Sequence, residues 1–418
     1  MEYSQTSKDL TNKLSKEIKQ KAGIYFTPPS CIQTNIELLK PYMNASSMFS
    51  VLEPSCGSGE YITALHASFS HLNITGIEWN ETIYNSIQHL NQNNITIHHA
   101  DFLEYNPNPI QNPPTSIQQP KKYDLIIGNP PYFVMKKEDV KKEYRPYFDG
   151  RPNIFILFII KSLQLLNNGG ILSFILPKNF MNCLYYDKTR KYIADHFQIL
   201  TIADCTQDKY IETQQETILL IVRKQENLTT VNNTAFLLST NNYTIFMTES
   251  DLPKIKALYQ NSTSLHHLGF NVHVGTVVWN QCKAILTNDS QKTLLIYSSD
   301  IQDNTLQIKT YNNEAKKNYI HKPGIHRPMI VINRGYGTGE YKFNYCLIDM
   351  AKEYLVENHL ICIESVNPDL THDELIIAYK KVIQSLNDIR THTFIQTYFG
   401  NSAINTTELN WILPIYVA

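Results

Sequence analysis

The strongest constraint on the fold of this chain is an alternation between short apolar runs and helical stretches over residues 50–225. The apolar runs have the length and composition of strands, and the segments between them have helical spacing. Strands that alternate with helices form a sheet with helices on its faces. The sequence therefore predicts a doubly wound α/β domain. The predicted strands include "FSVLEP", "NITGIEW", "YDLIIGN", "GGILSFILP" and "TILLIVRK", and the predicted helices include 60–70, 80–93 and 153–167.

The texture of the sequence changes after about residue 228. A polar bridge, "ENLTTVNNT", precedes irregularly spaced β-rich pieces such as "VHVGTVVWN", "TLLIYSSD", "PMIVINRGYG" and "HLICIES". Helices are predicted at 371–387 and 406–411. The length of 418 residues also suggests two domains. We therefore predict an α/β domain over 1–228 and a mixed α+β domain over 229–418.

The composition restricts the class of protein. The net charge is −1, so any basic surface must be local. The seven cysteines are scattered without a CxxC pair, which indicates neither a zinc site nor a disulfide framework, and no metal is expected. The polar N-terminus lacks the apolar segment of a signal peptide, and no window of 18 apolar residues is present. We therefore expect a cytoplasmic protein without a membrane span.

The stretch "VLEPSCGSGEY" (51–61) reads as a strand, a glycine-rich turn and the start of a helix. Gly57 and Gly59 allow a tight turn and close approach of the backbone to a ligand. The turn lacks the GKS or GKT ending of a phosphate-binding loop, and Ile62 replaces the third glycine of a dinucleotide fingerprint. The acidic Glu53 just before the turn instead suits a cationic ligand. S-adenosylmethionine carries a sulfonium and an ammonium group and no phosphate.

Further acids follow at the ends of the next two predicted strands. Glu78 in "TGIEWN" stands at the distance that suits a ribose diol. Asp101 in "HHADFLEY" can accept a hydrogen bond from the amino group of adenine, and Phe102 can stack on the ring. Alone, each acid is more often a solvated loop residue. Their order at successive strand ends predicts an adenosine-bearing cofactor.

The stretch "YDLIIGNPPYFVM" (123–135) places a polar amide, two prolines and an aromatic after a buried strand. The side-chain oxygen of Asn129 and the carbonyl of Pro130 can accept from one amino group, and Tyr132 offers a flat face. An exocyclic amine is a poor nucleophile because its lone pair is delocalised into the ring. Two acceptors favour a pyramidal nitrogen with a localised lone pair. We therefore interpret Asn129, Pro130 and Tyr132 as catalytic residues for transfer to a planar amine.

These motifs, in this order over residues 20–225, resemble the γ-class (Taq-like) DNA adenine-N6 methyltransferases of the type II modification methylases. "KAGIYFTPPSCIQTNIELL" (21–39) resembles the segment that precedes the glycine-rich motif of that class, which implies that Tyr25, Thr27 and Pro28 pack around the methionine part of the cofactor. The segments 151–181 and 210–222 also resemble the class. They imply that Phe158 lines the cofactor adenine and that Tyr210 stacks on the extruded base, where the class more often has phenylalanine.

The resemblance implies a Rossmann-like methyltransferase sheet over 1–228, S-adenosyl-L-methionine as cofactor, and a DNA target-recognition domain over 229–418. The substrate would be an adenine flipped out of double-stranded DNA, held between Tyr132 and Tyr210. Any restriction endonuclease would be a separate chain. The expected cofactor residues are Tyr25, Thr27, Pro28, Glu53, Cys56, Gly57, Gly59, Glu78, Asp101, Phe102, Asn129 and Phe158. The candidate DNA contacts, each of which alone could be a solvated charge, are Lys136, Lys137, Arg327, Arg334 and Lys342.

Several alternatives stay open at this point. NPPY also occurs in methyltransferases that act on a glutamine of release factors or on guanine N2 of ribosomal RNA. A methyltransferase-fold subunit that binds DNA without reacting is another alternative, against which the intact NPPY argues. A fused restriction nuclease would need an (D/E)xK arrangement, which "NPDLTHDELIIAYK" does not supply. Cytosine-N4 is a further acceptor that an NPPY site can hold.

Overall fold

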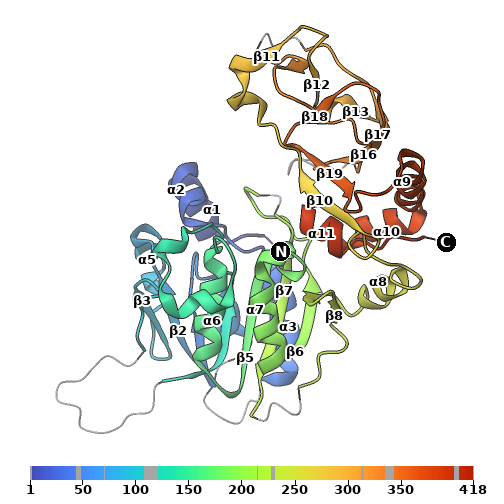
Figure 1. Cartoon of the computed structure of the whole chain (residues 1–418). Helices are drawn as coiled ribbons and strands as arrows, with labels where there is room; N and C mark the ends of the chain where they lie inside the picture. Colours follow the sequence, from blue (N-terminus) through green and yellow to red (C-terminus); the bar gives the residue numbers. More distant parts are fainter. Residues whose placement is uncertain are drawn as a thin grey trace. The chain divides into compact units, whose positions relative to one another are not determined.

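A computed structural model of the chain describes residues 2–43, 49–69, 71–107, 121–213, 215–226, 231–311, 315–334, 343–399 and 404–417. The chain forms two compact units, Met1–Leu252 and Pro253–Ala418 (Figure 1). The predicted boundary at residue 228 is therefore too early. The hairpin of β8 (Leu237–Thr240) and β9 (Tyr243–Phe246) belongs to the first unit. Phe246 packs in the core of that unit, and the Arg190 Nε donates to the Thr244 carbonyl at 2.5 Å.

The first unit is built on a seven-stranded sheet of order β3-β2-β1-β4-β5-β7-β6. The first five strands in this order are parallel neighbours, and β7 pairs antiparallel with both β5 and β6. The predicted Rossmann-like α/β sheet is confirmed. The strands are β1 (Phe49–Glu53), β2 (Leu72–Glu78), β3 (Ile95–His99), β4 (Tyr123–Gly128), β5 (Leu166–Pro177), β6 (Phe197–Asp204) and β7 (Thr217–Lys224).

Helices cover both faces of this sheet (Figure 1). Side chains of α3, α4 and α5 share one buried cluster with Val51, whereas those of α6 and α7 share another with Leu52. Successive residues of β1 thus face opposite cores, as expected for a strand buried on both sides. The helices are α3 (Pro29–Leu39), α4 (Glu60–Ser68), α5 (Glu81–Ile87), α6 (Ile154–Gln164) and α7 (Asp187–His196).

Two short helices, α1 (Gln5–Lys13) and α2 (Lys16–Ala22), precede α3. The Ser15 hydroxyl accepts from the N–H of Ile18 at the start of α2, and Gly23 ends that helix at φ +64°. These are ordinary start and stop signals for a helix. Leu10 of α1 packs in a small cluster with Phe26. The polar N-terminal segment is therefore an integral part of the first unit.

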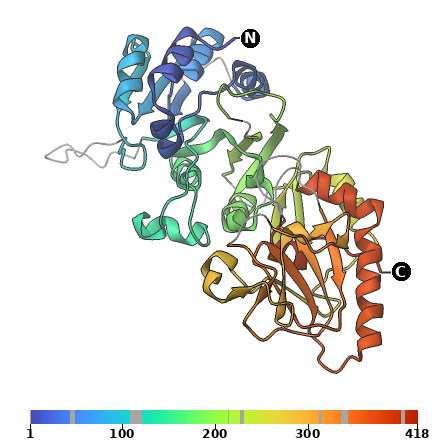
Figure 2. The same ribbon diagram turned by 90° about the horizontal axis from the view of Figure 1, so that it is seen from above.

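The second unit combines two four-stranded sheets, of orders β10-β19-β16-β17 and β11-β15-β12-β18, with helices (Figure 2). This confirms the predicted mixed α+β character. Its strands are β10 (Phe270–Val274), β11 (Leu286–Thr287), β12 (Thr293–Ile296), β13 (Ile301–Gln302), β14 (Thr305–Leu306), β15 (Tyr319–Ile320), β16 (Met329–Asn333), β17 (Tyr345–Ile348), β18 (Tyr354–Val356) and β19 (Leu360–Ser365). The remaining helices are α8 (Leu252–Leu258), which spans the division, α9 (His372–Leu386), α10 (Ile389–Tyr398) and α11 (Thr406–Trp411). In the described part of the chain, no helix has the length and apolarity to cross a membrane.

Candidate active site

The polar residues singled out at strand ends meet at one edge of the sheet. Glu53 ends β1, Glu78 ends β2, Asp101 follows β3 and Asn129 follows β4. Because these strands are parallel neighbours, their carboxyl ends lie side by side. The strand order also reverses between β1 and β4, which is where open α/β sheets bind ligands.

A cavity of about 530 Å³ opens at this edge. That volume lies within the range of cofactor sites. Of the residues predicted from sequence, those lining the cavity are Tyr25, Gly57, Glu78, Asp101, Phe102, Asn129 and Phe158. A recess of about 30 Å³ shares several of these residues and adds Thr27, Glu53 and Cys56. Five of the residues predicted to bind the cofactor, to act in catalysis or to stack on the base line neither space: Pro28, Gly59, Pro130, Tyr132 and Tyr210.

Glu78 ties the glycine-rich turn to the second strand. Its Oε2 accepts from the N–H of Gly57 at 2.9 Å, and its Oε1 accepts from the N–H of Asn80 at 2.8 Å. Gly59 shapes the same turn without lining the cavity. It has φ +77°, and a Cβ there would lie 2.4 Å from the Cδ1 of Leu90. The turn therefore presents Gly57 and Glu78 to the cavity as one unit.

Burial raises the pKa of Glu78 to about 7, from an ordinary value of 4.5. Between these values the unfolded chain has lost the proton while the folded protein retains it, so the folded protein loses stability as the pH rises from about 4.5 to 7. We expect Glu78→Gln to remove this pH-dependent decrease in the free energy of unfolding, which is on the order of 3 kcal/mol. Urea unfolding of cofactor-free protein at pH 5 and pH 8 measures it. Equal pH dependence in the two proteins would contradict the buried state of Glu78.

Glu53 is a buried carboxyl that forms no ion pair with the residues that the structure describes. Its Oε2 is inaccessible to water and has no hydrogen-bond partner among the described residues. Burial, followed by the nearby charge of Glu78, raises the pKa of Glu53 well above its usual range. The thiol of Cys56 donates to the Glu53 carbonyl at 3.6 Å rather than to the carboxyl. A cationic ligand group would satisfy such a carboxyl, as an ammonium group does.

Two aromatic rings from different elements form one wall of the cavity. Phe102 follows β3 and Phe158 belongs to α6, and their ring centroids lie 4.9 Å apart at 48°. Both rings are buried and both line the cavity. Asp101 is exposed beside them, and its Oδ1 accepts from the N–H of Leu103 at 2.8 Å. A flat ligand ring with an amino group finds an aromatic wall and an acceptor here.

The side chain of Asn129 is held in one orientation. Its Nδ2 donates to the Tyr25 carbonyl at 3.4 Å and to the Thr27 Oγ1 at 3.2 Å. The Tyr132 hydroxyl donates to the Asn129 Oδ1 at 2.5 Å, and the Ser55 hydroxyl donates to the Asn129 carbonyl at 3.1 Å. This network assigns the amide nitrogen to the "GIYFTPP" segment and leaves the amide oxygen as an acceptor. Thr27 thus contacts the side-chain amide of Asn129 directly.

Tyr132 contacts Asn129 and lies near Tyr210. The Tyr132 ring meets Phe155 edge-on at 5.9 Å, and its hydroxyl also lies 2.9 Å from the Ile175 carbonyl. Burial raises the pKa of Tyr132, and the nearby Tyr210 raises it further. Tyr210 is itself buried, and burial raises the pKa of its hydroxyl. Their contact with a target base stays a prediction.

Sequence reasoning missed one side of the cavity. Ile18, Lys21 and Ala22 of α2 line it, together with Trp79, whose surface is 61% exposed at the opening. A signal was present, because a serine at position 15 and a glycine at position 23 bracket a helix beside the "GIYFTPP" segment. Other lining residues that were not predicted include Pro54, Ser55, Phe133, Met135 and Ile154.

The predicted DNA contacts fall in both units. Lys136 and Lys137 are exposed directly after the NPPY segment. In the second unit, Arg334 is exposed, and the half-buried Arg327 donates to the Asn367 carbonyl. Lys342 lies outside the described residues. No metal was predicted from the sequence. In the structure, however, three potential metal-ligand atoms lie within 4.8 Å of one another, and they belong to Cys31, Cys205 and Asp208.

Comparison with known proteins shows that the chain is similar to restriction-modification methylases. Residues 11–211 match the family described as Eco57I restriction-modification methylase. Modification methylase CviBIII of Paramecium bursaria Chlorella virus NC1A is 27% identical over 423 residues, covering 99% of both chains. Type II methyltransferase M.CvrRI of Paramecium bursaria Chlorella virus XZ-6E is 25% identical over the same shares. Type II methyltransferase M.HincII of Haemophilus influenzae is 31% identical over 42% of this chain and 31% of its own.

The methylase family implies S-adenosylmethionine as the cofactor. The residues present fit it, because the unpartnered Glu53 carboxyl suits its ammonium group and the Phe102–Phe158 wall suits its adenine. Residues 11–211 therefore resemble an Eco57I-type methylase domain, and nearly the whole chain is similar to modification methylase CviBIII and to type II methyltransferase M.CvrRI.

Proposed function

We propose that this protein is a γ-class (Taq-like) site-specific DNA methyltransferase that methylates N6 of adenine as the modification part of a restriction-modification system. Its type II relatives support DNA methylation as the activity. The observation that carries the choice of an amino-group acceptor is the fixed orientation of Asn129. Thr27 and Tyr25 hold its amide nitrogen, so its oxygen, which accepts from the Tyr132 hydroxyl, keeps a second lone pair for a substrate amine. A cytoplasmic location belongs to the same proposal.

The chemistry would be a single displacement at a methyl carbon, in which the amine nitrogen gains the methyl group and S-adenosylhomocysteine is the leaving group. When bound, S-adenosylmethionine supplies an electrophilic methyl group. Asn129 Oδ1 and the Pro130 carbonyl accept hydrogen bonds from the two amine hydrogens and localise the lone pair on nitrogen. The surplus amine proton leaves to water after transfer, so no general base is invoked. Most of the rate enhancement then comes from positioning.

The acceptor must leave the helix stack before it can react, because N6 of a stacked adenine is out of reach of an enzyme site. We propose that Tyr132 and Tyr210 hold the extruded ring. A carbonyl oxygen has two lone pairs, so Asn129 Oδ1 can accept from the Tyr132 hydroxyl and from the target amine together. The bond between Tyr132 and Asn129 is therefore compatible with catalysis.

The second unit is proposed to select the DNA sequence. The alignments with CviBIII and M.CvrRI extend over 99% of this chain, so the relatives share this unit as well as the methylase domain. Arg327, Arg334 and Lys342 are proposed contacts there, and Lys136 and Lys137 are proposed contacts beside the active site. Arginine and lysine side chains of this kind contact phosphates or guanine edges.

Mass spectrometry of the nucleosides and peptides obtained by digestion tests the substrate class. Purified protein is incubated with methyl-labelled S-adenosylmethionine and with duplex DNA, ribosomal RNA or a release factor in parallel. We expect labelled N6-methyladenine from DNA alone. N4-methylcytosine would overturn the choice of base. Label confined to RNA or to a protein glutamine would overturn the choice of substrate.

A further inference from the structure

The loop between β6 and β7, which carries Tyr210, is held by the N-terminal segment of the chain. The Lys19 ammonium pairs with the Glu212 Oε1 at 2.6 Å. The Tyr3 hydroxyl donates to the Lys209 carbonyl at 3.1 Å. The Ser30 hydroxyl donates to the Asp208 carboxylate. Three side chains from before residue 31 thus fix the described part of this loop.

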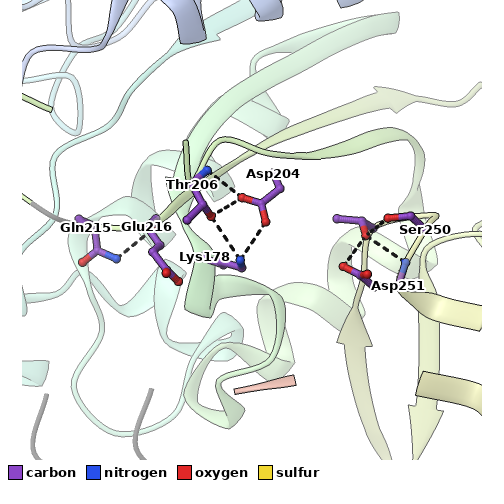
Figure 3. Close-up of polar contacts among 8 residues, drawn as sticks. Lys178, Asp204, Thr206, Gln215, Glu216, Ser250 and Asp251 are labelled. Carbon is purple, nitrogen blue, oxygen red and sulfur yellow. Dashed lines mark hydrogen bonds and ion pairs between the residues drawn. The ribbon is translucent and has the colours of Figure 1, made fainter. Parts of the chain in front are cut away.

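The base of the same loop has its own anchor. The Lys178 ammonium donates to the Asp204 Oδ2 at 2.8 Å and to the Thr206 Oγ1 at 3.2 Å (Figure 3). The Lys178 backbone N–H donates to the Glu216 carbonyl at 2.9 Å, where β7 begins. With both ends of the loop fixed to the sheet, the contacts of the N-terminal segment act on its middle, next to Tyr210.

Lys19 differs from the other paired lysines of the N-terminal helices by its burial. Its side chain is 5% exposed, and its ammonium also donates to the Thr11 carbonyl at 2.6 Å. The Lys8–Glu2 and Lys21–Glu17 pairs are exposed, and such pairs contribute little to stability. A buried ammonium is costly unless it is paired. Lys19 therefore holds Glu212 in a defined place.

The helix that carries Lys19 also borders the cofactor cavity. Ile18, Lys21 and Ala22 of α2 line that cavity, while Lys19 points to the Tyr210 loop. A helix of seven residues is short enough to move as one body. A ligand that contacts the lining residues of α2 therefore also affects the position of Glu212, because Lys19 of the same helix pairs with it.

We propose that Lys19 is a positioning residue that couples the cofactor cavity to the Tyr210 loop. This rests on the proposed function and deepens it. With the cavity filled, α2 is fixed, and Lys19 holds Glu212 so that Tyr210 meets the flipped base. Cofactor and DNA then strengthen each other's binding by the same factor, because such coupling is reciprocal.

The test compares Lys19→Met with Lys8→Met, which removes the same charge from an exposed pair of α1. DNA affinity is measured with and without S-adenosylhomocysteine, on a duplex with 2-aminopurine at the target adenine, whose fluorescence reports unstacking. We expect S-adenosylhomocysteine to increase the affinity for DNA about tenfold in the wild-type protein and in Lys8→Met. In Lys19→Met we expect this increase in DNA affinity to be lost. The increase in 2-aminopurine fluorescence should be smaller than in the wild-type protein, and the KM for DNA should be higher. The affinity for S-adenosylhomocysteine in the absence of DNA should be unchanged.

Two further variants keep the test decisive. Glu212→Gln acts from the more exposed side of the pair and should also lose the coupling, and the double variant should be no worse than Lys19→Met alone. If a folded Lys19→Met protein shows the coupling and the KM of the wild type, the proposed role of Lys19 is wrong and the proposed function still stands. If Lys19→Met does not fold, the same result in Glu212→Gln leads to the same conclusion. A wild-type protein that leaves DNA unmethylated would overturn the proposed function and this inference together.

Discussion

Replacing Asn129 with alanine is expected to abolish methyl transfer while the protein still binds its cofactor. The amide oxygen of Asn129 is the proposed acceptor for the target amine, and the Tyr25 and Thr27 bonds that orient it serve no purpose without it. Loss of one preorganised hydrogen-bonding group in an active site lowers the rate roughly a hundredfold to a thousandfold, and we expect the upper end here. Single-turnover methylation rates and calorimetric cofactor affinity measure the two effects separately.

Asn167→Ala is the matched control for this variant. The Asn167 Nδ2 donates to the Asp124 Oδ1 at 2.7 Å, near the start of β4 and therefore at the opposite edge of the sheet. The Asn167→Ala substitution removes a comparable carboxamide from a position that does not line the cavity. The methylation rate of this variant should therefore match that of the wild-type protein. If Asn129→Ala lost cofactor affinity in proportion to its rate, the assigned role of Asn129 would be wrong.

Gly23→Ala is expected to have the second largest effect. Gly23 ends α2 at φ +64°, and a Cβ there would lie 2.5 Å from the backbone nitrogen of Tyr132 and 3.0 Å from its carbonyl carbon and oxygen. Because no real Cβ is tolerated so close to backbone, the NPPY segment must shift. A displacement of about 1 Å can lower an enzymatic rate about a hundredfold. We therefore expect at least that loss in the methylation rate of a protein that remains folded.

Gly150→Ala separates crowding from backbone strain. Gly150 has the same φ of +64°, but a Cβ there would meet only two ring carbons of Tyr185, at 3.6 and 3.7 Å. Both variants should unfold at a lower temperature than wild type, since a side chain disfavours this backbone region. Only Gly23→Ala should lose methylation. Similar activity in the two variants would show that Gly23 does not support the NPPY segment.

The strands that could be predicted from the sequence are the ones buried on both faces. β4 and β7 are nearly continuous apolar runs, because helices or hairpins cover both sides of them. β6 forms one edge of the sheet, and its partly exposed Gln198 and Thr201 interrupt the apolar pattern. The helices α1 and α2 were also missed, because their polar residues outnumber the few that pack inward, such as Leu10.

The same contrast holds for the candidate site. Glu53, Glu78 and Asn129 could be found because each follows its own strand in a short motif, and parallel strands bring such ends together. Lys19 and its contact with Glu212 join positions 193 residues apart. No local pattern encodes a contact of that kind, since it arises only when the N-terminal helices pack against the sheet. The early domain boundary has a related cause, because a polar stretch marks a loop but not which core the next hairpin joins.

Sequencing that detects modified bases, applied to DNA from a methylation-free host that expresses this protein, tests the central claim most directly. The account predicts N6-methyladenine at nearly every copy of one short sequence and at few other adenines. Unmodified DNA, or methylated cytosine in place of adenine, from cells that contain folded protein able to bind S-adenosylmethionine would contradict it.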